Sequence, residues 1–145
     1  MLTTDQKGAV AELAIAHAAA ELGVGVFKPL TDGERYDLVF DLRPRLVRVQ
    51  CKWANKCGGA VVVRCYSCRR NPARMLIRTY SEREIDAVAA YCPETDQCYL
   101  LPPTLFAGTR QVHLRVDPSR NNQRSKINWA RDFELGARLS ALVGP

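Results

Sequence analysis

Residues 36–53 read YDLVFDLRPRLVRVQCKW, and this stretch says most about the fold and chemistry of the chain. Two short apolar runs flank Arg43-Pro44-Arg45, so we expect two strands joined as a hairpin. Because side chains alternate along a strand, Gln50 and Lys52 should share one face of the second strand. Asp37 opens the first strand, and pairing of the two runs would bring it close to both.

This combination of side chains predicts a phosphate-processing metal site. An Asp, a Gln oxygen and a Lys ammonium around one point suit a hard divalent cation beside a phosphate group. Taken singly, Asp37 reads as a strand-start residue and Lys52 as a solvated lysine. It is their spacing together with Gln50 that favours a site over these structural roles.

The pattern resembles the PD-(D/E)xK nuclease superfamily. That family places an Asp on one strand of a hairpin and an acidic residue, any residue and then Lys on the next. Asp37 and Lys52 match the outer elements, whereas Gln50 stands where Glu or Asp is usual and Tyr36 where Pro is usual. A Gln at this place is a recurring variant in a branch of group I intron homing endonucleases.

Further stretches, in the same order along most of the chain, are similar to that endonuclease branch. They are Lys7-Gly8 with Glu12, then Glu84-Ile85-Asp86, then Cys98-Tyr99-Leu100-Leu101-Pro102, and finally Pro118-Ser119-Arg120-Asn121 leading into Trp129. The resemblance implies a single domain over residues 1–145, with a restriction-endonuclease-like core: a mixed central sheet flanked by helices, in the α/β (α+β) class.

The resemblance also implies the roles of the site residues. Asp37, the Gln50 side-chain oxygen and the Cys51 main-chain carbonyl would ligate Mg²⁺, with Mn²⁺ as the alternative, and Lys52 would orient water or stabilise the pentavalent phosphate. Because Gln50 is neutral, we expect the free protein to bind Mg²⁺ weakly, with Glu12 and the scissile phosphate adding negative charge.

Glu12 falls on the inner face of the first predicted helix. Thr3 and Gln6 have capping-box spacing, so the helix should start there and stop at Gly23. At 100° per residue Glu12 lies among small and apolar side chains, so it should face inward towards the site. The structural alternative is a partly exposed Glu at the helix edge.

The remaining elements follow from apolar runs and turn residues. We expect strands over 24–28, 60–66, 97–101 and 112–116, helices over 81–91 and 127–142, a basic irregular stretch over 68–78 and a polar loop over 118–125. Alternating helices and strands of this kind indicate a mixed sheet.

The overall charge is consistent with a polyanionic partner. The 145 residues are 47% apolar and 25% charged, with a formal net charge of +6 and a pI near 9.2. Two groups of basic and amide side chains are the candidate contacts to double-stranded DNA, because Arg suits phosphates and Asn or Gln suits base edges. These candidates are Arg69 and Arg70 in the first group, and Arg120, Asn121, Asn122, Gln123, Arg124 and Lys126 in the second.

The sequence carries no signal-peptide pattern and no apolar run of membrane-spanning length, so we expect a cytoplasmic protein without a membrane partner. We expect its six cysteines to be reduced thiols. The CxxC of Cys65 and Cys68, with Cys57 upstream, suggests zinc as an alternative, but no second pair completes a four-ligand site, and we expect none to bind. His17 and His113 are interpreted as structural or surface residues, and Trp129 and Phe133 as core.

The predicted function is a metal-dependent DNA endonuclease that hydrolyses phosphodiester bonds, resembling homing endonucleases. The resemblance implies that the chain acts as a homo-oligomer, either a dimer or a tetramer, because one small domain holds one site and a duplex needs two cuts. The alternatives are a Holliday-junction resolvase-like nuclease and a catalytically inactive nucleic-acid-binding module of the same fold.

Overall fold

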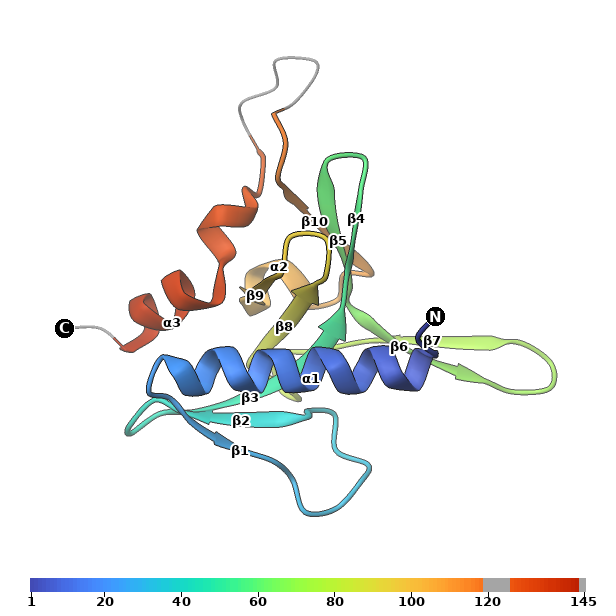
Figure 1. Ribbon diagram of the computed structural model, residues 1–145. Helices are drawn as coiled ribbons and strands as arrows, with labels where there is room; N and C mark the ends of the chain where they lie inside the picture. Colours follow the sequence, from blue (N-terminus) through green and yellow to red (C-terminus); the bar gives the residue numbers. More distant parts are fainter. Residues whose placement is uncertain (119–125, 144–145) are drawn as a thin grey trace.

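The computed structural model describes residues 1–118 and 126–143, and its centre is a five-stranded mixed sheet (Figure 1). The strand order is β1-β2-β3-β8-β9, comprising β1 (Gly25–Phe27), β2 (Leu38–Asp41), β3 (Leu46–Trp53), β8 (Ala87–Cys92) and β9 (Gln97–Leu101). The β3–β8 pair is parallel and the other pairs are antiparallel. The predicted hairpin and the α/β (α+β) class are confirmed.

Helix α1 (Thr4–Glu21) covers one face of this sheet (Figure 1). Its start is fixed by the predicted capping box, in which Thr3 and Gln6 each bind the other's main-chain amide. Gly23 follows the helix with φ of 81°, a left-handed conformation that glycine adopts without steric cost. Ala11, Ile15 and Ala19 are fully buried against the sheet.

The expected helix over 81–91 is wrong, because β8 runs through the middle of the sheet. Ser81 and Glu84 do form a capping interaction, with both the amide and hydroxyl of Ser81 donating to the Glu84 carboxylate, but it closes only a turn. The strand packs into both cores, with Val88 and Ala90 on one side and Ala87 and Ala89 on the other. A strand covered on both faces lacks alternation, and its alanines favour a helix locally.

A smaller sheet covers the opposite face. It has the order β10-β5-β4, with β4 (Asn55–Cys57), β5 (Ala60–Arg64) and β10 (Gln111–Arg115). Val61, Val63, Val112 and Leu114 point inward and pack with Phe106 of the short helix α2 (Pro103–Phe106). The smaller sheet therefore presents its other face to solvent.

The basic stretch expected to be irregular is a hairpin of β6 (Tyr66–Arg70) and β7 (Met75–Thr79). It projects from the body of the molecule (Figure 1), and Met75, Leu76 and Ile77 are exposed on it. Without a buried face, the strand lacks the apolar alternation by which strands are predicted.

The last predicted helix is divided into a 3₁₀ turn, η1 (Ala130–Phe133), and α3 (Leu135–Val143). Glu134 separates them in an extended conformation and bridges to Tyr99 of β9. Phe133 packs against the core, as expected. Among the described residues, no helix is long and apolar enough to cross a membrane.

Candidate active site

The site lies where β2 ends and β3 continues. The last paired residues are Leu38 and Val49, whereas β3 runs on to Trp53. Asp37 lies at this point: its amide donates to the Val49 carbonyl (2.8 Å), and its Oδ2 accepts from the Cys51 amide (2.9 Å). The hairpin therefore holds the Asp37 carboxylate against the uncovered edge of β3.

Asp37 sits in an unfavourable environment for a negative charge. Burial raises the pKa of its carboxyl above the usual value, and the negative charge of Glu12 adds to this. The Cys51 amide, Lys52 and Lys28 act in the opposite direction without cancelling the effect of burial. A cation bound beside Asp37 would relieve this penalty.

Lys52 extends to the face of the sheet opposite α1. Its Nζ donates to the Tyr66 carbonyl (2.8 Å) and lies 5.0 Å from the centre of the Tyr80 ring. Burial lowers the pKa of this lysine. The ammonium is thus fixed by a carbonyl and an aromatic face, and it keeps further protons to donate to a phosphate or a water molecule.

Glu12 is half-buried on α1 and forms an ion pair with Lys28, just after β1. Its charge raises the pKa values of both Asp37 and the Cys51 thiol, so it lies within electrostatic range of the site. The bond to Glu12 in turn raises the pKa of Lys28. Lys28 is not predictable from the sequence, because nothing in its local sequence separates it from a solvated lysine.

The two remaining predicted ligands, Gln50 and Cys51, have side chains on opposite faces of β3. Gln50 is half-buried on the same face of β3 as Lys52, and no hydrogen bond of its side chain occurs in the described part of the chain. The Cys51 side chain packs on the α1 side, and burial raises the pKa of its thiol. Because the N–H and C=O of a strand residue point to the same side, the Cys51 carbonyl is directed with its amide towards Asp37.

These oxygen donors fit a hard divalent cation. Within residues 1–118 and 126–143, no cluster of three or more His, Cys, Asp or Glu side chains could hold a metal ion. A site would therefore combine the Asp37 carboxylate with the Cys51 carbonyl and the Gln50 amide oxygen, with Glu12 as the second carboxylate. All four are oxygen donors, which Mg²⁺ prefers.

A second set of residues, missed in the sequence, supports Lys52. Arg35 donates to Ser67 Oγ (2.7 Å) and the Thr79 carbonyl (2.8 Å), and its Nε lies 3.2 Å from Glu84 Oε2. Its guanidinium stacks 4.1 Å from the centre of the Tyr80 ring. Arg35 therefore joins the β6–β7 hairpin to the ring that contacts Lys52.

The stretch Glu84-Ile85-Asp86 makes structural contacts in the same part of the molecule. Ile85 is fully buried, and Asp86 accepts from the amide and side chain of Arg48 (2.8 Å and 3.0 Å to Oδ2). Burial alone would raise the pKa of Asp86, but the bonds from Arg48 outweigh it and lower the value. These residues hold β8 in register with β3 and have structural roles.

Of the predicted DNA-binding residues, Arg69 is exposed on β6, and Lys126 is exposed and starts the last described segment. Arg70 lies in β6, and its side chain is outside the described part of the structure. Arg120, Asn121, Asn122, Gln123 and Arg124 lie outside the described residues.

The six cysteines are free thiols, and both histidines are exposed, as predicted. His17 pairs with Glu21 on the outer face of α1 (3.0 Å). Cys57 and Cys68 are exposed on different sheets, whereas Cys65 is buried.

A comparison with known families defines the class of protein. The sequence profile of the PD-(D/E)XK endonucleases matches residues 2–136, and this chain belongs to that family. A solved structure entitled "The structure of a bacterial homing endonuclease: I-Ssp6803I" is similar over 95% of this chain and 93% of that chain, with a TM-score of 0.77 and 27% sequence identity. A search of curated proteins gives no match. The predicted family and fold are thereby confirmed.

Proposed function

We propose that this endonuclease is a Mg²⁺-dependent, homing-type enzyme that hydrolyses phosphodiester bonds in double-stranded DNA. The observation that carries the proposal is the placement of Asp37 against Cys51 at the uncovered edge of β3, one residue from Lys52. The similarity to a homing endonuclease at 27% identity supports the homing type.

Asp37, Gln50, the Cys51 carbonyl and Glu12 are the proposed metal ligands. When bound, a divalent cation would supply Lewis-acid stabilisation of the phosphate and a more acidic water molecule. Mg²⁺ is the proposed ion, with Mn²⁺ as the alternative, since the donors are oxygens.

Lys52 is the proposed catalytic cation. Negative charge spreads over the phosphate oxygens as the bond to the attacking water forms, and a fixed ammonium stabilises that charge without reorganising. Tyr66 and Tyr80 hold the ammonium in place. Its lowered pKa makes proton exchange with a neighbouring water easier than for a solvated lysine.

The proposed DNA contacts are basic side chains at phosphates and amide side chains at base edges. The basic ones are Arg69, Arg70, Arg120, Arg124 and Lys126, and the amides are Asn121, Asn122 and Gln123. Each chain carries one site, so we propose a homo-oligomer, a dimer or tetramer, for cutting both strands.

The test is cleavage of supercoiled plasmid, linear duplex and four-way junctions, each with Mg²⁺, with Mn²⁺ and with EDTA. We expect metal-dependent cutting of duplex DNA that ceases in EDTA. Preference for junctions would favour the resolvase alternative. Binding without cutting under all conditions would identify an inactive nucleic-acid-binding module and overturn the proposal.

A further inference from the structure

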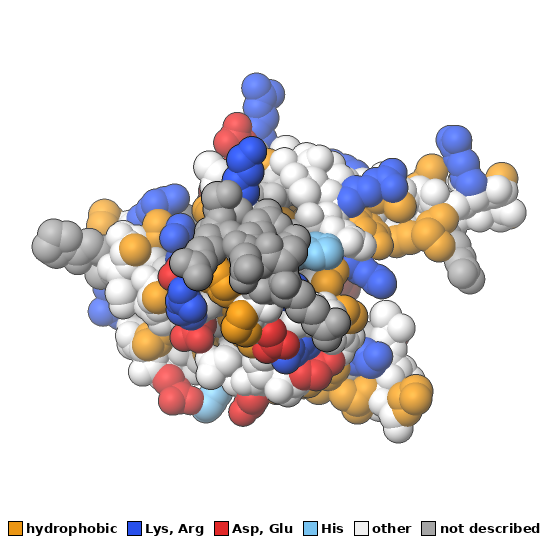
Figure 2. Space-filling view, turned by 90° about the horizontal axis from the view of Figure 1, so that it is seen from above, with side chains coloured by type: hydrophobic (Ala, Val, Ile, Leu, Met, Phe, Trp, Pro, Cys, Tyr) orange, Lys and Arg blue, Asp and Glu red, His pale blue; other side chains and the backbone are white. Residues whose placement is uncertain are grey.

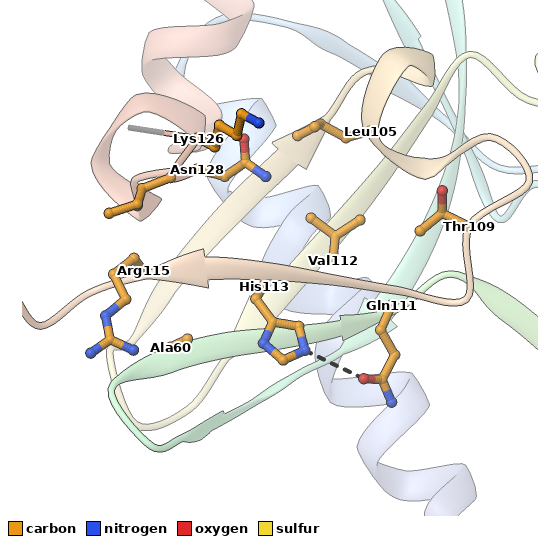
Figure 3. A pocket seen from close by; sticks show the side chains of 10 residues that line it. Ala60, Leu105, Thr109, Gln111, Val112, His113, Arg115, Lys126 and Asn128 are labelled. Atoms are coloured by element: carbon orange, nitrogen blue, oxygen red, sulfur yellow. Dashed lines mark hydrogen bonds between the residues drawn. The ribbon is translucent and has the colours of Figure 1, made fainter. Parts of the chain in front are cut away.

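Two adjoining grooves extend from the site, the first over the outside of the smaller sheet and the second along the edge of its end strand, β10. The first, about 530 Å³, has Lys52 and Trp53 of β3 in its lining together with Arg64 of β5 and Gln111 of β10. The second, about 400 Å³, follows β10 from Gln111 past His113 to Arg115, and Lys126 lines it from the side of the strand to which Val112 points (Figure 3). Gln111 belongs to both grooves.

No carboxylate lines either groove within the described chain. The cationic side chains in the two linings are Lys7, Lys52, Arg64, Arg115 and Lys126. By contrast, Asp86 lines another pocket of the surface, and Glu21 and Glu134 line a further one. In Figure 2 the Asp and Glu side chains likewise gather mainly in the lower half of the view, whereas Lys and Arg dominate its upper half. A lining of this kind attracts a polyanion.

The alternation of β10 and β5 determines which side chains face the grooves. Val112 is buried, whereas Gln111 and His113 are exposed and project from the other side of the strand (Figure 3). His113 Nε2 lies 3.4 Å from Gln111 Oε1. Arg64 is exposed, pairs in register with Gln111, and makes no ion pair within the described residues.

We infer that the outer face of the β10-β5-β4 sheet recognises base edges in the DNA major groove, with Gln111 and Arg64 as the residues that determine sequence preference beside the cut. The inference rests on the proposed function. Gln111 and Arg64 lie on the neighbouring strands β10 and β5, and two strands side by side fit the major groove, where Arg binds guanine and Gln binds adenine in bidentate fashion. Four residue steps along β10 span roughly 14 Å, which is about four base pairs.

The groove also explains how recognition and cleavage would be coupled. Gln111 and Arg64 share one groove with Lys52, so a duplex whose bases contact this sheet would present a nearby phosphate to the site. Arg115 has a different role: it donates to the carbonyls of Gly58, Asp117 and Pro118 and so holds the ends of the sheet together.

The test is selection from a randomised DNA duplex library with the full chain carrying Lys52→Ala, which should suppress cleavage. We expect a defined preferred sequence. Adding Gln111→Ala or Arg64→Ala should remove the preference at one or two base pairs, by roughly tenfold or more, and leave the other positions unchanged. Gln97→Ala and Arg83→Ala, exposed residues that line neither groove, are the matched controls and should leave the whole profile intact.

Three results would overturn the inference: an unchanged profile in both groove variants, an equal loss of affinity for all sequences, or no base preference before either change. The second would show phosphate contact alone. Plasmid cleavage by the wild-type chain, measured in parallel, distinguishes a failure of base recognition from a failure of the proposed nuclease function. Cutting without base preference would support the nuclease function and overturn base recognition. A preferred sequence without cutting would support base recognition and overturn the nuclease function.

Discussion

The Asp37 carboxylate accepts a hydrogen bond from the Cys51 main-chain amide at 2.9 Å, which ties the start of one strand to the edge of the next. The contact brings the charge beside a carbonyl oxygen and next in sequence to Lys52. It fixes the carboxylate through Oδ2, and within residues 1–118 and 126–143 no side chain hydrogen-bonds to the other oxygen.

Replacing Asp37 or Lys52 by alanine should lower the DNA cleavage rate at least about 100-fold, because each would remove a charge that stabilises the transition state. DNA binding should change little, and the fold should stay intact. The measurement is single-turnover cleavage in Mg²⁺, with binding followed separately. Asp132→Ala, on the exposed surface of η1, is the control. Wild-type rates in Asp37→Ala would remove Asp37 from the site.

The Gln50→Glu variant should need several-fold less Mg²⁺ for half-maximal cleavage. The two side chains have nearly the same size, and a hard cation prefers an anionic oxygen to an amide. The measurement is the midpoint of a Mg²⁺ titration of the cleavage rate. An unchanged midpoint would place Gln50 away from the metal, and a sharp loss of activity would indicate that its amide donates a hydrogen bond.

Asp37→Asn should stabilise the metal-free protein increasingly as pH rises. Burial raises the pKa of Asp37 in the folded state, so between the ordinary value of 3.8 and the raised one the folded protein holds a proton that the unfolded chain has released. Folding stability contributed by this group therefore falls as pH rises through that window, and the asparagine variant avoids the loss. The amide oxygen can still accept from Cys51.

The measurement for this variant is thermal unfolding in EDTA from pH 3.5 to 7. The gap in melting temperature between variant and wild type should widen above pH 3.8 and then become constant. A gap that is independent of pH would contradict the burial argument.

Arg35→Ala should lower the free energy of unfolding by about 1–3 kcal/mol, because it leaves the half-buried Glu84 without this partner and removes the bond to the Thr79 carbonyl. Cleavage should also slow, since the Tyr80 ring, which contacts Lys52, would lose the guanidinium that stacks on it. Denaturant unfolding checks the first effect. The exposed Arg83→Ala variant should stay within about 0.5 kcal/mol of wild type. Equal effects of the two substitutions would refute a positioning role for Arg35.

Purified protein should contain no stoichiometric zinc. Cys57 lies on the three-stranded sheet and Cys68 on the two-stranded one. The Cys65 thiol is buried, and burial raises its pKa to about 11. A protonated thiol is a poor zinc ligand. Elemental analysis giving one zinc per chain would overturn this expectation.

The sequence by itself determined the hairpin and the shared face of Gln50 and Lys52, because alternation along a half-buried strand is a local property. It also determined the start and end of α1, since capping requires only Thr3, Gln6 and Gly23. The spacing of Asp37, Gln50 and Lys52, together with further similar stretches in the same order along the chain, indicated the family.

Only the tertiary structure decided that residues 87–92 form the central strand. Alanine-rich segments favour helix when isolated, and the pairing of β8 with β3 together with burial on both faces overrides that preference. The same holds for the surroundings of the site. Lys28, Arg35 and Tyr80 lie far from Lys52 in the sequence and have no local signature, so their roles arise only when the sheet and the β6–β7 hairpin bring them together.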